Sequence, residues 1–177
     1  MRHRFWGVWG VAAALLLAGP AGLAAKGKPA AAVISLKGRS APQWWYGGAQ
    51  AAQDVFVTEL VASGKFSQVS VGGFGGGVDD DRVFATQRRG GKSGNPQAMK
   101  AAAKRAGKRL GVRYLVVCTA SGMQVASRLI DTSTGEITWA DEARAPSPDR
   151  SGARAAATRS ARKLVARLNA RELALDD

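Results

Sequence analysis

Residues 125–143 read Val-Ala-Ser-Arg-Leu-Ile-Asp-Thr-Ser-Thr-Gly-Glu-Ile-Thr-Trp-Ala-Asp-Glu-Ala. Two runs with strand character, 125–131 and 137–143, flank the tetrapeptide Thr132-Ser133-Thr134-Gly135. Glycine adopts the left-handed backbone conformation without steric cost, so Gly135 suits the bulge position of a hairpin turn. This stretch predicts an antiparallel β-hairpin, and it makes a β-sheet the framework of the domain.

Three more strands are predicted upstream of the hairpin. Residues 32–36 form a short apolar run, and residues 66–71 alternate in polarity. Residues 112–119 are almost continuously apolar, which is typical of a central strand covered on both faces. Cys118 is the only cysteine and falls in this run, so we expect a buried packing residue rather than a reactive thiol.

Apolar residues at helical spacing predict three helices. The first spans residues 49–63 and stops at Gly64, the second starts at Asn95-Pro96 and stops at Gly111, and the third spans about 151–173. The element order predicts an α/β fold of the α+β sandwich kind. It combines a mixed sheet of about five strands, ending in the antiparallel hairpin, with three helices packed on it.

The N-terminus has the three regions of an export signal. Basic residues precede an apolar run from Phe5 to Leu17, and small residues follow up to Ala25. We therefore expect residues 1–25 to be a removable signal peptide and residues 26–177 to form one soluble periplasmic or secreted domain. An uncleaved anchor is the alternative, but the run is shorter than the roughly 20 apolar residues that a membrane span needs.

The position of the single cysteine argues against a lipid anchor. A lipoprotein signal needs a cysteine at the cleavage point, and the chain has only Cys118, so we expect no lipidation at a signal-peptide cysteine. Between the predicted strand at 66–71 and the second helix, residues 72–94 are rich in glycine and charge, which indicates a long mobile loop.

The chain is strongly basic, with a formal net charge of +13. Loss of residues 1–25 would remove two arginines and no acid. Outside the cytoplasm the candidate partners are an acidic envelope protein, lipid head groups, lipopolysaccharide or wall polymers; nucleic acid is not expected. The alternative is that the charge only keeps the protein soluble.

Two segments resemble a known family. The first is residues 106–119, which read Ala-Gly-Lys-Arg-Leu-Gly-Val-Arg-Tyr-Leu-Val-Val-Cys-Thr. The second is residues 126–140, with Arg-Leu-Ile-Asp followed by Thr-Gly-Glu-Ile-Thr-Trp-Ala. Both are similar to the periplasmic domain of the curli assembly/transport (CsgG-type) family, whose relatives include the LpoB-like activators. The resemblance implies a periplasmic accessory module. The residues after Phe66 depart from the family pattern, and no long amphipathic hairpin pair is present, so pore formation is not implied.

Few residues can support catalysis. The only histidine, His3, would leave with the signal peptide, which excludes histidine-based catalysis and histidine metal ligands. Asp141 and Glu142 are neighbours on a predicted strand and should point to opposite faces, although a carboxylate-based hydrolase remains a third reading. Residues 79–81, three aspartates, and residues 90–93, Gly-Gly-Lys-Ser, match calcium and phosphate loops only in part. No catalytic, metal or cofactor site is expected.

Aromatic and basic side chains are the candidates for partner binding. Trp44, Trp45 and Tyr46 lie between glycines, where flat rings can stack on sugars or anchor a protein, or can instead cap the core. Basic residues line the second and third helices, either as solvated faces or, if both helices share one side of the sheet, as a continuous cationic surface. The basic candidates are Lys100, Lys104, Arg105, Lys108, Arg109, Arg159, Arg162 and Lys163.

These observations favour an exported, non-enzymatic periplasmic adaptor of the cell envelope that binds another envelope component. The alternative is a cationic binder of anionic envelope lipids or wall polymers. The sequence leaves the partner and the oligomeric state open.

Overall fold

The computed structural model of the chain describes residues 27–37, 46–72, 96–121, 123–170 and 175. The predicted signal peptide and all but the first residue of the glycine-rich segment lie outside these ranges. The predicted domain boundaries therefore stay predictions.

A five-stranded mixed sheet forms the centre of the fold, with the strand order β2-β1-β3-β4-β5. β1 pairs in parallel with β2 on one side and with β3 on the other, whereas β3, β4 and β5 pair antiparallel. The predicted mixed sheet with a C-terminal hairpin is confirmed. The strands are β1 (Ala30–Lys37), β2 (Gln68–Gly72), β3 (Tyr114–Ser121), β4 (Gln124–Asp131) and β5 (Glu136–Arg144).

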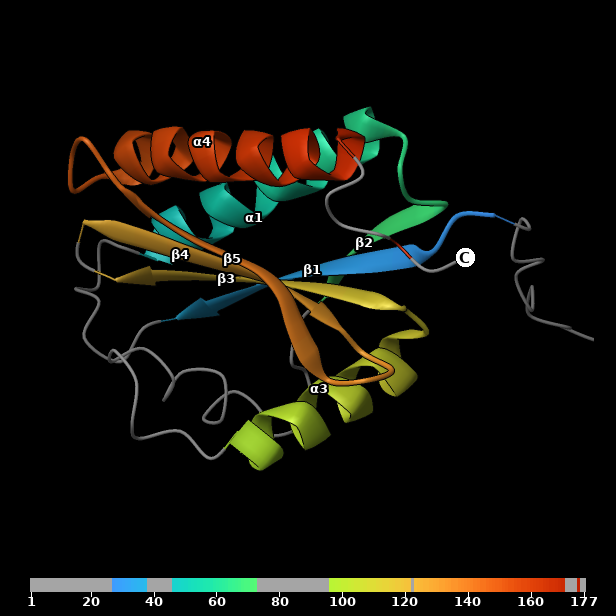
Figure 1. Cartoon of the computed structure of the whole chain (residues 1–177). Helices are drawn as coiled ribbons and strands as arrows, with labels where there is room; N and C mark the ends of the chain where they lie inside the picture. The colour runs from blue at the N-terminus through green and yellow to red at the C-terminus, as the bar shows by residue number, and fades with distance from the viewer. Residues whose placement is uncertain (1–26, 38–45, 73–95, 122, 171–174, 176–177) are drawn as a thin grey trace, which may run out of the picture.

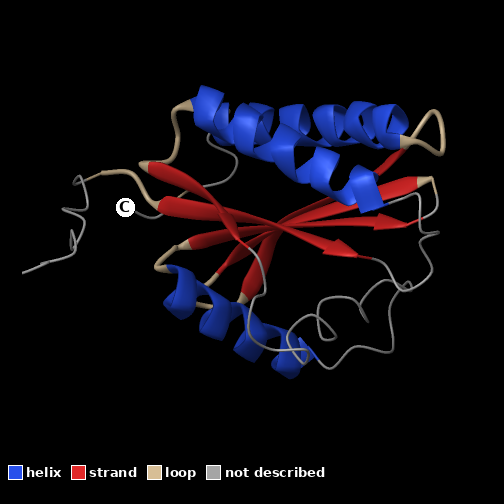
Figure 2. Cartoon of the chain, turned by 180° about the vertical axis from the view of Figure 1, so that it is seen from behind, coloured by secondary structure: helices blue, strands red, loops and turns tan. Residues whose placement is uncertain are grey.

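The helices cover both faces of this sheet. Helices α1 (Tyr46–Ser63) and α4 (Arg150–Asn169) pack side by side on one face, and α3 (Pro96–Leu110) packs on the other (Figures 1 and 2). The connection from β1 to β2 crosses the sheet in one direction, and the connection from β2 to β3 crosses back. Because crossovers between parallel strands are right-handed, this reversal places α1 and α3 on opposite faces.

Each face of the sheet has its own apolar cluster. The cluster under α1 and α4 contains Phe56, Leu60, Tyr114, Leu129 and Trp139 together with many alanines, and it is the larger one. The cluster under α3 is built from Ile34, Leu115, Val117 and Ile130 of the sheet with Met99 and the alanines of the helix.

The central strand β3 is buried on both faces, as its apolar sequence predicts. Every residue from Tyr114 to Ala120 is buried, and Cys118 is 1% exposed. Burial raises the pKa of the Cys118 thiol to about 12, although a hydrogen bond with Ser127 acts in the opposite direction. Because the thiolate is the reactive form, this cysteine is a packing residue, in agreement with the sequence analysis.

A buried glutamine ties α1 to the parallel strands. The Gln53 side-chain amide donates to the carbonyl oxygens of Val33 in β1 (2.7 Å) and Gly72 in β2 (3.2 Å), and its oxygen accepts from the Ser35 hydroxyl (3.1 Å). A buried amide is tolerated when its donors and acceptors are paired in this way. Gln53 therefore fixes the position of α1 over the boundary between β1 and β2.

Candidate functional site

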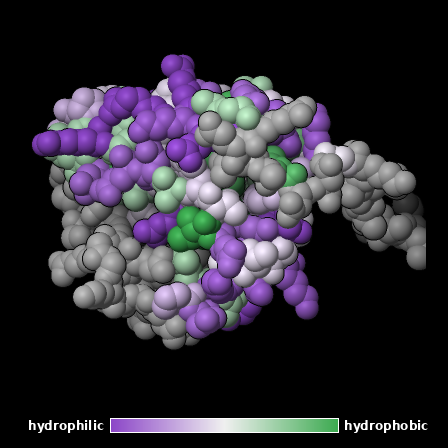
Figure 3. All heavy atoms as spheres, in the orientation of Figure 1, coloured by the Kyte–Doolittle hydropathy of each residue, from purple (hydrophilic) through white to green (hydrophobic). Residues whose placement is uncertain are grey.

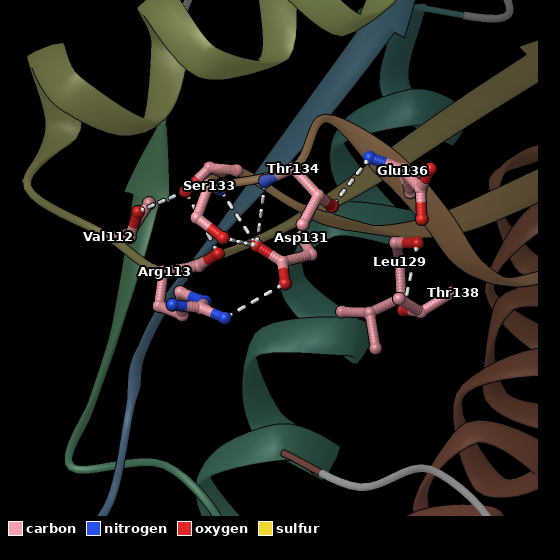
Figure 4. Close-up of polar contacts among 9 residues, drawn as sticks. Val112, Arg113, Leu129, Asp131, Ser133, Thr134, Glu136 and Thr138 are labelled. Carbon is pink, nitrogen blue, oxygen red and sulfur yellow. Dashed lines mark hydrogen bonds and ion pairs between the residues drawn. The ribbon is translucent and has the colours of Figure 1, made fainter. Parts of the chain in front are cut away.

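The turn between β4 and β5 is held by a network centred on Asp131 (Figure 4). Asp131 Oδ1 accepts from the backbone N–H and the hydroxyl of Ser133 (both 2.8 Å) and from the N–H of Thr134 (3.4 Å), and its Oδ2 contacts Arg113 Nη2 (3.1 Å). Gly135 has a φ of 75°, the left-handed conformation predicted for it. These residues shape the hairpin, so the family-like motif is a structural one.

Two opposing effects act on the pKa of Asp131. Burial of the carboxyl raises the pKa, while hydrogen bonds from Ser133, the charge of Arg113 and the Thr134 N–H lower it. The lowering effects prevail, and the pKa lies below its ordinary value. The carboxylate is therefore ionised at neutral pH and acts as an acceptor rather than as a proton donor.

The same turn contacts α3 closely. A Cβ atom added at Gly135 would lie 2.7 Å from the Cα and carbonyl oxygen of Lys100, and one added at Gly107 would lie 2.2 Å from Cβ of Thr132. Lys100 Nζ also pairs with Glu136 Oε1 at 3.0 Å. The hairpin thus sets the position of α3, and with it the direction in which the basic residues of α3 point.

The solvent side of α3 carries all five predicted basic residues of this helix. The helix contains no acidic residue, and its buried side consists of Met99, Ala102, Ala103, Ala106 and Gly107. Lys104 and Lys108 are exposed and make no ion pair with any residue in the described part of the chain. Arg105 and Arg109, the two predicted arginines of this helix, are also exposed.

The predicted basic residues of α4 have partners within the fold. Arg159 Nη2 donates to the carbonyl oxygen of Arg144 (2.5 Å), Arg162 Nε lies 3.4 Å from Glu59 Oε1, and Lys163 Nζ lies 2.9 Å from Asp141 Oδ1. These contacts join α4 to β5 and to α1. All three side chains are nevertheless exposed enough to reach a partner.

The two basic helices do not share one side of the sheet. Because α3 and α4 lie on opposite faces, the condition for a continuous cationic surface is not met within one molecule (Figure 1). The idea of such a surface from both helices is therefore wrong. Each helix presents its own basic surface instead.

The aromatic and acidic candidates from the sequence lie in different parts of the chain. Trp44 and Trp45 lie outside the described residues, and Tyr46 is the first residue of α1. Asp141 faces α4, where it pairs with Lys163. Because side chains alternate along β5, the neighbouring Glu142 faces the other side of the sheet. Among the described residues no group of three His, Cys, Asp or Glu side chains could hold a metal ion.

An open groove of about 630 Å³ separates β5 from α4. Figure 3 shows apolar atoms exposed over β5, with the hydrophilic side chains of α4 above them. Sequence reasoning did not find this groove, because it depends on how α4 lies over the last strand. Its lining residues are Ile137, Thr138, Trp139, Ala140 and Asp141 of β5 and Lys163, Ala166 and Arg167 of α4.

Neither a family model nor a curated protein matches the sequence significantly. Similar solved structures include the PelC dodecamer from Paraburkholderia phytofirmans, with 15% identity, 78% of this chain and 86% of that chain covered, and a TM-score of 0.45. The LpoB C-terminal domain from Escherichia coli shares 20% identity over 64% of this chain and 79% of that chain, with a TM-score of 0.39. Lipoprotein GNA1162 from Neisseria meningitidis shares 11% identity over 78% and 99%, also with a TM-score of 0.39.

An LpoB domain is thus among the structures similar to this chain, as the sequence resemblance predicts, whereas the CsgG-type assignment stays a prediction. None of the helices in the described ranges has the length and apolar character that a bilayer span requires.

Proposed function

We propose that this chain is an exported, non-enzymatic accessory protein of the cell envelope, which binds another envelope component through its basic helices and the aromatic segment 44–46. The observation that carries the proposal is the solvent side of α3. Five basic residues and no acidic residue occupy this helix, and its buried side is fixed on the sheet.

The α3 surface is better suited to an external partner than the basic residues of α4. Lys163 and Arg162 already neutralise acidic side chains of the fold, whereas Lys104 and Lys108 pair with no acid in the described ranges. Charges without internal partners contribute most to attraction toward an acidic surface. In the chain, the aromatic segment lies between β1 and the first residue of α1, and in this proposal it supplies a second contact.

Export and the missing histidine support a binding role. The signal-like N-terminus points to the envelope, and its removal would leave the domain without any histidine. The two carboxylates that a hydrolase would need, Asp141 and Glu142, lie on opposite faces of β5 and cannot act on one bond together.

The proposal is tested by recovery of partners from envelope extract. The variant Lys104→Glu/Lys108→Glu should recover at least tenfold less of the bound component than the unchanged protein, because it reverses the charge of the central part of the α3 surface. Trp44→Ala/Trp45→Ala should also reduce recovery. Circular dichroism checks that each variant is folded.

A matched control reverses two basic residues elsewhere. Lys28→Glu/Lys65→Glu changes the net charge by the same amount, and both residues lie outside the two basic helices. Equal losses in the α3 variant and in this control would show nonspecific charge attraction and would contradict the proposal. Unchanged recovery in Trp44→Ala/Trp45→Ala would remove the aromatic segment from it.

A second function is favoured by the same helices. Because neither α3 nor α4 contains an acidic residue, the protein is also suited to bind anionic lipids or wall polymers directly. Binding of this kind weakens steeply with salt. Sedimentation with phosphatidylglycerol vesicles in low and high salt checks it, and binding that persists at high salt would speak against it.

A further inference from the structure

The outer edge of β5 has no strand partner in the described part of the chain. The N–H of Ala145 donates to the carbonyl oxygen of Met123 (2.7 Å). This bond shows which residues of β5 turn their backbone N–H and C=O groups toward β4. Hydrogen-bonded and non-hydrogen-bonded pairs alternate along antiparallel strands. The backbone groups of Ala143 and Asp141 therefore face β4, whereas those of Ala140 and Glu142 point outward.

Contacts at either end mark the length of this edge. The carbonyl oxygen of Arg144, which belongs to the outward set, accepts from Arg159 of α4. At the other end the register shifts between Leu129 and Ile130, so Thr138 is an extra residue on β5 and bends the strand. The regular edge that can accept a further strand therefore covers residues 139–143.

Both apolar and charged side chains line the groove beside this edge. Ile137 is 37% exposed, and Trp139 and Ala166 complete the apolar lining. Lys163 and Arg167 line the α4 side, and the only acid in the lining, Asp141, is neutralised by Lys163 at 2.9 Å. With two cations and one acid in the lining and no acidic residue in α4, the local charge is positive and favours an acidic occupant.

We propose that the β5 edge and the groove beside it bind an extended peptide segment with acidic side chains, which adds to the sheet as a further strand. This deepens the proposed function, on which it rests, by naming one docking site and the chemistry of the partner. Main-chain hydrogen bonds to Ala140 and Glu142 hold the segment. Because side chains alternate along a strand, every second residue faces the groove, where small apolar and acidic side chains fit Trp139 and Arg167.

The probe is a fluorescein-labelled peptide of alternating valine and glutamate, about ten residues long, so that it spans the edge with some overhang. Fluorescence anisotropy with the purified protein should show saturable binding. Backbone amide exchange should show Ala140 and Glu142 exchanging rapidly in the absence of peptide and becoming protected when it is bound. The same peptide with lysine for glutamate, or with proline at alternate valines, should bind at least tenfold more weakly.

Two protein variants test the edge and the groove separately. Ala140→Pro removes an outward N–H without removing a bond to β4, and it should weaken binding at least tenfold. Arg167→Glu reverses the charge of the groove wall and should weaken binding to a similar degree, while Arg154→Glu, an exposed arginine of the same helix outside the groove, should stay within twofold of the unchanged protein. If Ala140→Pro does not fold, Arg167→Glu and the amide exchange decide the question.

Several results would overturn the proposal. They are the absence of peptide binding, equal binding of the proline-interrupted peptide, and equal losses in Arg167→Glu and Arg154→Glu. Self-association that Ala140→Pro abolishes, measured by analytical ultracentrifugation, would show that the edge pairs with a second copy of this chain instead. A negative result in these peptide-binding experiments would not contradict the proposed function, because the recovery of partners from envelope extract depends on α3 and on Trp44 and Trp45.

Discussion

Gly135 brings the turn between β4 and β5 against the backbone of Lys100 in α3. A Cβ atom at position 135 would lie only 2.7 Å from the Cα and the carbonyl oxygen of Lys100, whereas the hydrogen atom of glycine fits there. Gly64 has a similar left-handed conformation, with a φ of 63°, but has no atom within 4 Å of a Cβ position. Comparing the two glycines therefore separates the energetic cost of the left-handed backbone conformation from the cost of packing against α3.

We expect Gly64→Ala to destabilise the fold by about 1–2 kcal/mol, the ordinary cost of the left-handed conformation for a residue with a Cβ. Gly135→Ala should cost at least about 1 kcal/mol more, because α3 must also move away from the turn. Urea unfolding of the two variants and the unchanged protein measures both values. Equal costs would show that the turn and α3 are not in close contact.

Asp149 gives the fold a dependence on acid pH. It is the N-cap of α4, where its Oδ1 accepts from the Gly152 N–H (2.7 Å) and from the hydroxyls of Ser151 (2.8 Å) and Ser147 (2.9 Å). These hydrogen bonds, with that from Gly152 the largest, lower the pKa from 3.8 to about 2. Because the pKa in the folded state is depressed, the carboxylate stabilises the fold above pH 3.8, and this contribution disappears as the pH falls toward 2.

Replacement of Asp149 separates its charge from its capping bond. Asp149→Asn keeps an oxygen that can accept from the Gly152 N–H but does not titrate, so stability at neutral pH should change little and its decline between pH 4 and 2 should become shallower. Asp149→Ala should lower the unfolding temperature at neutral pH as well. Thermal unfolding across this pH range measures both effects, and an unchanged acid slope in Asp149→Asn would contradict the assignment.

At the scale of single elements, α4 packs on α1 and on the sheet through small side chains. Gly152, Ala153, Ala156, Ala157, Ser160 and Ala161 are all buried on the inner side of this helix. Such residues let the helix approach α1 and the sheet closely, so a larger side chain would meet close-packed neighbours.

We expect Ala157→Leu to destabilise the fold by about 1–3 kcal/mol through overpacking. Ala155→Leu, at a half-buried position of the same helix, should change stability by less than about 1 kcal/mol. Denaturant unfolding measures both variants. Similar small effects would show that α4 is loosely packed, and the groove beside β5 would then lack a rigid wall.

The elements themselves could be predicted because their signals are local. Gly64 and Gly111 end helices with positive φ values, and the hairpin turn forms at Gly135, since each position needs a conformation that glycine adopts easily. The continuous apolar run of β3 indicated burial on both faces. Asp149 was missed as a cap, although an aspartate just before a helical run is a preferred N-cap.

At the scale of the whole molecule, the sequence could not predict which helix covers which face. That arrangement depends on the strand order, which places β1 between β2 and β3, and no local pattern encodes it. The right-handed crossover rule assigns the faces only once the order is known. For the same reason the groove between β5 and α4 could not be found, and the basic residues of α3 and α4 could be listed but not located relative to one another.

The position of α3 and α4 on opposite faces has a consequence for assembly. A partner seated on α3 leaves α4 directed away from it, toward a different neighbour. The sheet then acts as a rigid spacer between two contact surfaces of like charge, so occupancy of one need not compete sterically with occupancy of the other. If both proposed surfaces are used, a single small domain of this design is bivalent and links two acidic components that never touch each other.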